Sequence, residues 1–150
     1  MQPADMPAVL TLHEVSFSLL GRAYTPAQQA AHAVLVRQPD YVPDVLRSDL
    51  WLAERDGVLL GSAGWLASGP GEGRIRKVFI HPDGARQGLA TRLVQAAEAR
   101  ARDAGCTRFM LRGYLDAVPL YRKLGYADDA LGEMELPGGL SMPVLFMRKG

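Results

Sequence analysis

The fold is decided by VFIHPDGARQGLATRLVQAAEARARDAGC, which spans residues 78–106. This stretch predicts a strand that ends at Ile80, a His-Pro-Asp-Gly turn, and a long helix over residues 89–104. Apolar residues in the helix form two adjoining rows, as expected for one buried face. The rows are Leu89, Leu93, Ala97 and Ala90, Val94, Ala101. Gly105 ends the helix because glycine readily adopts the left-handed conformation that follows many helices.

The turn before this helix has the features of a pyrophosphate site. N–H groups at a helix N-terminus have no partner within the helix, and the helix dipole places partial positive charge there. Gly88 and Ala90 are small enough for a bulky anion to approach the main chain, and Arg86 adds a permanent charge. A structural alternative is that Gly88 only packs the helix against the sheet.

Two common phosphate-binding motifs are excluded by specific residues. A nucleoside-triphosphate loop needs Lys followed by Ser or Thr after its second glycine, whereas Gly88 is followed by Leu89 and Ala90. A dinucleotide fingerprint needs three glycines at fixed spacing, and only Gly84 and Gly88 are present.

Two helices are expected before this stretch. Asp5 can cap the first, whose apolar face would carry Val9, Leu12, Val15 and Leu19. The second begins at Thr25-Pro26-Ala27-Gln28, which combines a capping hydroxyl, proline at the first helical position and glutamine three residues after the cap. This helix should extend to about Val36, before Pro39.

The remaining segments predict strands and one short helix. Asp56-Gly57 between the apolar runs 50–54 and 58–66 indicates a hairpin, and residues 74–80, 109–111, 133–136 and 144–147 are expected to be strands. Asp116 can cap a short helix that ends near Leu124. The order predicts a mixed α/β (α+β) fold whose central, mostly antiparallel sheet contains one βαβ crossover and is flanked by helices.

Composition limits the class of protein. With 150 residues, 48% of them hydrophobic, and a formal net charge of +1, we expect one globular domain with no bulk attraction to nucleic acid or to a membrane surface. Cys106 is the only cysteine, which excludes an internal disulfide and a cysteine-based zinc site, and His13 and His32 show no metal-ligand spacing. No apolar run could cross a bilayer and the N-terminus lacks a basic leader segment, so we expect a cytoplasmic protein.

Residues 78–106, followed by YLDAVPLYRKLGY at residues 114–126, resemble the two signature regions of the GNAT superfamily of N-acetyltransferases. The resemblance covers about residues 4–148 in element order, but its specificity lies in residues 78–126. It implies a GNAT-like single domain over residues 1–150. The strand that ends at Ile80 would splay from its parallel neighbour, and acetyl-CoA (coenzyme A) would lie in the opening.

The resemblance also implies which residues bind the cofactor. Main-chain groups of Val78, Phe79 and Ile80 would pair with the pantetheine arm. The pyrophosphate would be held by N–H groups of Arg86, Gln87, Gly88, Leu89, Ala90 and Thr91. Ala85 replaces the first residue of the family pattern, so Arg86 would supply the charge from the next position. Asp116 stands where many members have an asparagine that meets the pantetheine, but it would serve equally well as a helix cap.

Tyr121 matches the family tyrosine that lies near the cofactor sulfur. A phenol within hydrogen-bond reach can protonate the departing thiolate, a role worth about 10²–10⁴-fold in rate. The alternative is an ordinary core tyrosine. An N–H near Phe79 or Ile80 would stabilise the negative charge that develops during transfer, provided that the strand is locally distorted there.

The sequence departs from the family pattern in two further places and carries one basic cluster. Many members carry a glutamate as base on the strand 74–80, which here has no carboxylate. Glu72 and Glu54 lie outside it, and His81 is expected to be a turn residue, so either a water chain serves as base or the amine arrives neutral. The cluster of Arg74, Arg76 and Lys77 either attracts an acidic acceptor or forms a solvated edge. Helix signals begin almost at Met1, so the first family strand is either missing or provided otherwise, for instance by a partner chain.

Together these features predict an acetyl-CoA-dependent N-acetyltransferase. It would move the acetyl group to a primary amine of a small molecule or peptide by direct attack in a ternary complex. A noncatalytic acetyl-CoA sensor or scaffold, or an interaction domain with a purely structural glycine turn, are the alternatives. A homodimer is compatible with the sequence.

Overall fold

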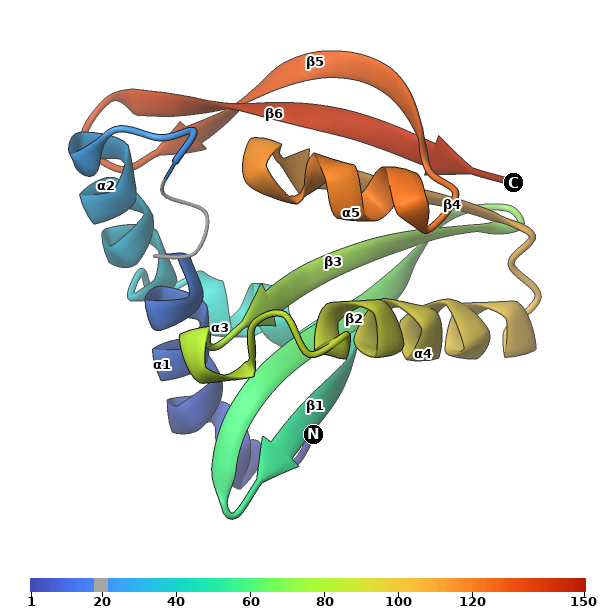
Figure 1. Cartoon of the computed structure of the whole chain (residues 1–150), viewed down its shortest axis with the longest axis horizontal. Helices are drawn as coiled ribbons and strands as arrows, with labels where there is room; N and C mark the ends of the chain where they lie inside the picture. Colours follow the sequence, from blue (N-terminus) through green and yellow to red (C-terminus); the bar gives the residue numbers. More distant parts are fainter. Residues whose placement is uncertain (18–21) are drawn as a thin grey trace.

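A six-stranded sheet in the order β1-β2-β3-β4-β6-β5 runs through the molecule (Figure 1). The structure, a computed structural model, describes residues 1–17 and 22–150. All neighbouring strands are antiparallel except β3 and β4, which are parallel and are joined through a helix. The strands are β1 (Asp49–Arg55), β2 (Val58–Gly69), β3 (Glu72–Ile80), β4 (Arg108–Tyr114), β5 (Ala127–Leu136) and β6 (Leu140–Lys149). The predicted mixed fold with one βαβ crossover is confirmed.

Helices cover both faces of this sheet. They are α1 (Met6–Ser16), α2 (Pro26–Val36), α3 (Tyr41–Leu46), α4 (Leu89–Asp103) and α5 (Val118–Lys123), with short 3-10 turns η1 (Pro3–Asp5), η3 (Pro82–Gly84) and η4 (Leu115–Ala117). α4 packs on β1, β2 and β3, whereas α1 contacts β2 and β3, and α2 contacts β5 and β6. None of the described helices is both long and apolar enough to span a membrane. No strand precedes β1 in the described part of the chain, as predicted.

The predicted N-terminal cap is present in α2 but not in α1. α2 begins with the predicted reciprocal cap, because the Thr25 hydroxyl accepts the Gln28 N–H at 3.1 Å and the Gln28 side chain accepts the Thr25 N–H at 2.9 Å. In α1, the Asp5 carboxylate instead accepts the Gln2 N–H at 2.7 Å and makes no cap bond to the helix. The expected side-chain cap at Asp5 is therefore wrong.

The buried face of α1 is also shifted from the predicted one. Val9 and Leu12 are buried as expected, but Val15 is 37% exposed, and Leu19 lies outside the described residues. His13 and Ser16 complete the buried stripe instead. Polar side chains on this face were not expected from the apolar pattern, and they are used in the site described below.

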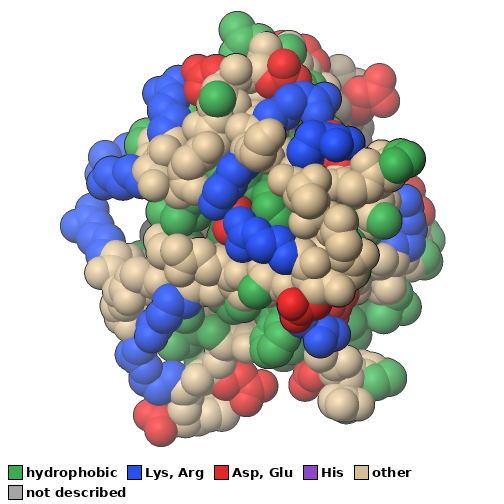
Figure 2. Space-filling model, turned by 90° about the vertical axis from the view of Figure 1, so that its right-hand side faces the viewer, with side chains coloured by type: hydrophobic (Ala, Val, Ile, Leu, Met, Phe, Trp, Pro, Cys, Tyr) green, Lys and Arg blue, Asp and Glu red, His purple; other side chains and the backbone are tan. Residues whose placement is uncertain are grey.

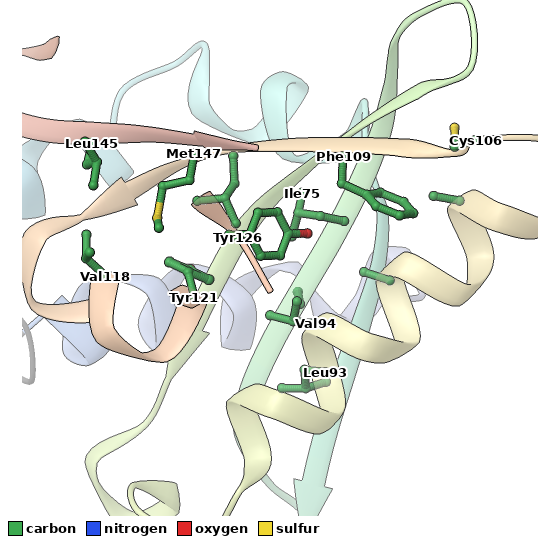
Figure 3. Close-up of a cluster of buried hydrophobic side chains, with 14 residues drawn as sticks. Ile75, Leu93, Val94, Cys106, Phe109, Val118, Tyr121, Tyr126, Leu145 and Met147 are labelled. Carbon is green, nitrogen blue, oxygen red and sulfur yellow. The ribbon is translucent and has the colours of Figure 1, made fainter. Parts of the chain in front are cut away.

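The main core lies between α4, α5 and the sheet (Figure 3). The inward face of α4 follows the predicted rows, with Leu93, Val94, Ala97 and Ala101 buried. Ile75, Phe109 and Met147 meet this face from the strands, and Tyr121 and Val118 meet it from α5. Burial of each large side chain contributes about 1.5–3 kcal/mol to folding. Cys106 is buried in the same cluster.

One carboxylate interrupts this apolar core. Glu98 of α4 is 1% exposed and accepts hydrogen bonds from the Tyr126 hydroxyl at 2.7 Å and from the Lys149 ammonium at 3.1 Å. These bonds join α4 to the segment after α5 and to the end of β6. A buried carboxylate is stable only when it is paired and hydrogen-bonded in this way.

Candidate functional site

An opening forms where β3 and β4 separate. The two strands pair only from Glu72 and Arg108 to Ile75 and Leu111. Beyond that point β3 pairs only with β2, so its edge facing β4 has no strand partner from Arg76 to Ile80 among the described residues. This geometry leaves main-chain groups of β3 available to an extended ligand.

The same part of β3 carries a β-bulge. Lys77 and Val78 lie opposite a single residue of β2, Ala63. Lys77 has a φ of 56°, a left-handed conformation that costs energy for residues other than glycine and asparagine. The bulge supplies the local distortion that an N–H donor near Phe79 requires, which no sequence pattern could reveal.

A chain of buried hydrogen bonds holds the bulge. The Ser62 hydroxyl donates to the carbonyl of Lys77 at 2.7 Å, so it accepts from Nε2 of His13, which lies 2.9 Å away. Nδ1 of His13 then accepts from the Tyr41 hydroxyl at 2.7 Å. Burial, with a smaller contribution from the charge of Lys77, holds the pKa of His13 well below its usual value, consistent with this neutral tautomer.

A pocket of about 390 Å³, called the loop pocket here, runs from the opening to the start of α4. Tyr121 lines it, and so do all of the predicted cofactor-binding residues except Gln87. They are Val78, Phe79, Ile80, Arg86, Gly88, Leu89, Ala90, Thr91 and Asp116. The structure thus brings together residues of β3, the turn before α4, and the segment around α5.

The turn before α4 presents unpaired N–H groups. The N–H groups of Arg86, Gln87 and Gly88 have no acceptor among the described residues, and the first helical bond is from Arg92 N–H to Gly88 O at 3.2 Å. Gly88 has a φ of +70°, and a Cβ added there would meet nothing within 4 Å. The turn is therefore open to a large anion and has donors for it, which fits a pyrophosphate.

Tyr121 reaches the loop pocket from α5. Its side chain is 5% exposed, and its hydroxyl has no hydrogen-bond partner among the described residues. Burial raises the pKa of the Tyr121 phenol above its usual value, and the neighbouring Tyr114 adds to this shift. The phenol therefore keeps its proton at neutral pH and can donate it.

A second pocket, of about 60 Å³, shares its wall with the loop pocket. Both are lined by Val78, Phe79, Tyr114 and Tyr121. The second pocket, called the cationic pocket here, is lined in addition by Arg74, Arg76, Lys77, Arg112, His32 and Tyr41, among others. The two pockets meet at Tyr121 and at the bulge.

The burial of the basic cluster excludes one of its two interpretations, that of a solvated edge. The side chains of Arg76 and Lys77 are only 11% and 13% exposed, so they do not form a solvated edge. Asp44 of α3 pairs with both of them, with 2.9 Å between its Oδ2 and Lys77 Nζ. Burial alone would raise the pKa of Asp44, but hydrogen bonds and charge from Lys77 and Arg76 outweigh burial and lower the pKa to about 2. Sequence analysis missed α3, and with it this contact.

The chain matches the model of the Acetyltransferase (GNAT) family over residues 17–126. That is well over half of its length. The chain belongs to the GNAT family of acetyltransferases.

Solved structures similar to this GNAT enzyme include several N-acetyltransferases. A GCN5-related N-acetyltransferase from Rhodopseudomonas palustris superimposes with a TM-score of 0.88 at 21% identity, covering 99% of this chain and 91% of that one. The PaiA N-acetyltransferase of Thermoplasma acidophilum, solved with coenzyme A, gives 0.78 at 12% identity, covering 99% and 94%. The ribosomal-protein-S18-alanine N-acetyltransferase of Escherichia coli gives 0.66 at 16% identity, covering 99% and 89%. The fold is that of the GNAT enzymes, whose cofactor is acetyl-CoA.

The side chains of two residues in this acetyltransferase make contacts other than those predicted. Asp116 does not cap α5, because the 3-10 turn η4 places it before the helix and Ala117 occupies the N-cap position. Its carboxylate accepts the N–H of Ala23 at 3.2 Å, while the residue still lines the loop pocket. The side chain of Gln87 is directed to Arg55 and to the carbonyl of Asp83, so only its main chain faces the turn.

No carboxylate lines the cationic pocket among the described residues. Glu72 pairs with Arg148 at 3.1 Å, and Glu54 is exposed on the hairpin. His81 accepts the Asp83 N–H at 3.0 Å and is the turn residue that was predicted. His32 Nε2 lies 3.0 Å from the Tyr114 hydroxyl, and burial, followed by the charges of Lys77 and Arg112, lowers the pKa of His32 to about 4. His32 is therefore neutral at pH 7.

Proposed function

We propose that this GNAT enzyme transfers the acetyl group of acetyl-CoA directly to a primary amine of a small molecule or peptide, in a ternary complex. We also propose that residues 1–150 act as a single acetyltransferase domain. The observation that carries this proposal is the shared wall of the two pockets at Tyr121 and the bulge. A cofactor in the loop pocket and an amine in the cationic pocket would meet there.

The loop pocket fits acetyl-CoA, which supplies the acetyl group as a thioester when bound. The N–H groups of residues 86–91 would bind the pyrophosphate, with the dipole of α4 and the charge of Arg86 favouring the anion. The unpaired edge of β3 at Val78 and Ile80 would pair with the pantetheine amides as an added strand. Asp116 lines the same groove and offers an acceptor.

The chain's own groups at the junction would carry the transfer. Tyr121 holds a proton and, in this proposal, donates it to the departing sulfur. An N–H group at the bulge, that of Val78, would bind the oxygen on which negative charge develops. Because none of the described residues that line the cationic pocket is a carboxylate, we infer that the amine loses its proton to water before attack.

A noncatalytic acetyl-CoA-binding module is the second candidate, because a carboxylate base is missing from the cationic pocket. Release of free coenzyme A in the presence of an amine, at a rate above that without it, would exclude such a module. Intersecting rather than parallel lines in a two-substrate initial-rate plot would support direct transfer over a covalent acetyl-enzyme. We place the activity in the cytoplasm, where acetyl-CoA is available.

Ligand-dependent unfolding tests the cofactor site. At a hundredfold excess over its Kd, acetyl-CoA should stabilise the fold by about 2.7 kcal/mol, or raise Tm by about 5–10 °C, whereas ATP and a dinucleotide should not. Gly88→Glu places a carboxylate in the turn and should remove the shift. Gly138→Glu is the matched control, because Gly138 also has a positive φ, of +83°, and open space around it, but lies in the β5–β6 turn. An undiminished shift in Gly88→Glu would contradict the placement of the pyrophosphate.

A further inference from the structure

Four cationic side chains line the cationic pocket, and two of them pair with one carboxylate. They are Arg74, Arg76, Lys77 and Arg112, and Asp44 is ion-paired with Arg76 and Lys77. The protein as a whole has a net charge of only +1, so this concentration of charge is local. Local fields of one sign in a partly desolvated cleft attract ligands of the opposite sign.

The strand geometry directs these charges to the opening. Arg74 lies opposite Met110, and Ile75 opposite Leu111, in the last two pairs of the β3–β4 ladder. Arg76 and Arg112 are the next residues on the two strands, at the point where the strands separate. Side chains alternate between faces, so Arg74 and Arg76 lie on the face of β3 opposite the buried Ile75. The cations therefore surround the mouth of the splay from both strands.

Two of the four cations have no counter-ion. Arg74 and Arg112 make no ion pair with any described residue, and the four residues at 18–21 include no carboxylate. The Nε atoms of Arg74 and Arg76 are buried without a hydrogen-bond partner among the described groups. Burial, with the nearby guanidinium groups of Arg112 and Arg76, lowers the pKa of Arg74.

Several exposed arginines elsewhere are paired with carboxylates, whereas Arg74 and Arg112 are partly buried without one in the described part of the chain. Arg148 contacts Glu72 and Asp129 at 3.1 and 2.9 Å, and Arg122 contacts Asp128 at 2.6 Å. Figure 2 shows basic and acidic side chains next to one another on one face of the surface. The buried guanidinium nitrogens without a hydrogen-bond partner among the described residues belong to Arg74 and Arg76, beside the proposed transfer site, where an anionic ligand would complete their hydrogen bonds.

We propose that Arg74 and Arg112, with Arg76 and Lys77, bind a carboxylate or phosphate carried by a small primary amine, and so select anionic amines as acceptors. The inference rests on the proposed function and names the substrate class for it. The guanidinium fork matches both oxyanions. The amine end of such a molecule would reach Tyr121 and the bulge, because these groups line the same pocket. The volume of about 60 Å³ suits a compact molecule rather than a folded protein segment.

The test compares amines in pairs that differ only in charge. Amino acids are assayed against their amides, and phosphoethanolamine against ethanolamine, by release of coenzyme A, with the acetyl-CoA-induced shift in Tm measured on the same protein. The proposal expects kcat/KM to be at least tenfold higher for the anionic member of an accepted pair. If only the amino acids are acetylated, the pocket binds a carboxylate; if only phosphoethanolamine is acetylated, it binds a phosphate.

Substitutions in the cationic pocket test whether its arginines cause the preference for anionic amines. Arg112→Gln and Arg74→Gln should each lower kcat/KM for anionic amines tenfold or more, mainly through KM, and leave neutral amines and the acetyl-CoA shift unchanged. Arg112→Lys should retain part of the preference, and Arg112→Glu should reverse it. Arg37→Gln removes the same charge from an exposed position, where Arg37 pairs with Glu14, and should change nothing.

Four outcomes would overturn the proposal. The neutral amine of a pair could be acetylated as fast as the anionic one or faster, or the arginine variants could lose equal kcat/KM for both amines. The protein could also bind acetyl-CoA but acetylate no small anionic amine, or accept only an acidic peptide. Absence of an acetyl-CoA shift in the unaltered protein would instead overturn the proposed function, and this inference with it.

Discussion

Tyr121 is placed where a proton donor to the departing sulfur is needed. Its phenol keeps its proton because burial raises its pKa, and its hydroxyl has no competing protein partner among the described residues. Tyr121→Phe removes only the hydroxyl. We expect kcat to fall by about 10²-fold or more with little change in the Kd of acetyl-CoA, measured by coenzyme A release and by the Tm shift.

The matched control for this change is Tyr126→Phe. Tyr126 contacts Tyr121, with ring centroids 6.1 Å apart, but its hydroxyl donates to Glu98 in the core. Its replacement should lower stability by about 1–3 kcal/mol and leave kcat unchanged. Unchanged turnover in Tyr121→Phe would leave that tyrosine with a packing role only.

The position of a single residue could be predicted from the sequence where neighbouring residues determine the local structure. Gly88 and Tyr121 lie in the loop pocket because the turn and the short helix are set by local signals around each. Asp116 shows the limit of such rules, since a capping residue is recognised only if the helix start is known, and the turn η4 moved that start. The buried state of Arg76 depends on α3, which is distant in sequence.

The bulge in β3 depends on β2 and α1 rather than on its own sequence. Ser62→Ala leaves the carbonyl of Lys77 and the Nε2–H of His13 without partners, both within the protein interior. We expect a loss of about 1–3 kcal/mol in the free energy of unfolding. Because the donor N–H groups near Val78 would shift, kcat should also fall about tenfold or more while the KM for acetyl-CoA changes little.

Ser68→Ala is the control on the same strand. Ser68 is exposed and its hydroxyl contacts Glu72 at the far end of β2, so neither kcat nor stability should change measurably. A Ser62→Ala enzyme that is destabilised but retains full kcat would show that the hydrogen-bond chain supports folding alone.

Elements with strong local signals were predicted within a few residues. The capping box of α2 and the Asp-Gly hairpin are specified by adjacent side chains, and α4 by three turns of apolar periodicity. α3 was missed because six residues that include Pro43 are too short to show a helical period. β5 and β6 extend beyond their predicted cores because strand pairing, not composition, sets their length.

At the scale of the molecule, the N-terminal helices enclose two histidines against the sheet. His13 is 0% exposed and its ring lies 4.2 Å from that of Phe79, while His32 is 1% exposed and is stacked on Phe17 at 4.0 Å. Both have lowered pKa values, chiefly because burial disfavours the charged imidazolium. The packing of α1 and α2 on the sheet is therefore coupled to proton binding.

The sign of this coupling predicts loss of stability in mild acid. The unfolded chain binds protons at these histidines near pH 6.5, whereas folded His32 does so only near pH 4. Stability is therefore fully present above pH 6.5 and falls as the pH drops toward 4, by about 1.4 kcal/mol per pH unit for His32, with His13 adding to the slope. The carboxylate of Asp44 does not contribute here, because its lowered pKa of about 2 places its effect below pH 4.

Urea unfolding at pH 7, 6 and 5 measures this slope. His32→Gln keeps a side chain that can hydrogen-bond to Tyr114 but cannot be protonated, so the decrease between pH 6.5 and 5 should shrink by about 2 kcal/mol. His81→Gln removes a histidine from the surface turn instead and should leave the slope unchanged. A stability that stays constant from pH 7 to 5 would mean that the helical layer opens to water and admits the charged imidazolium, and that α1 and α2 are held to the sheet less tightly than their buried contacts imply.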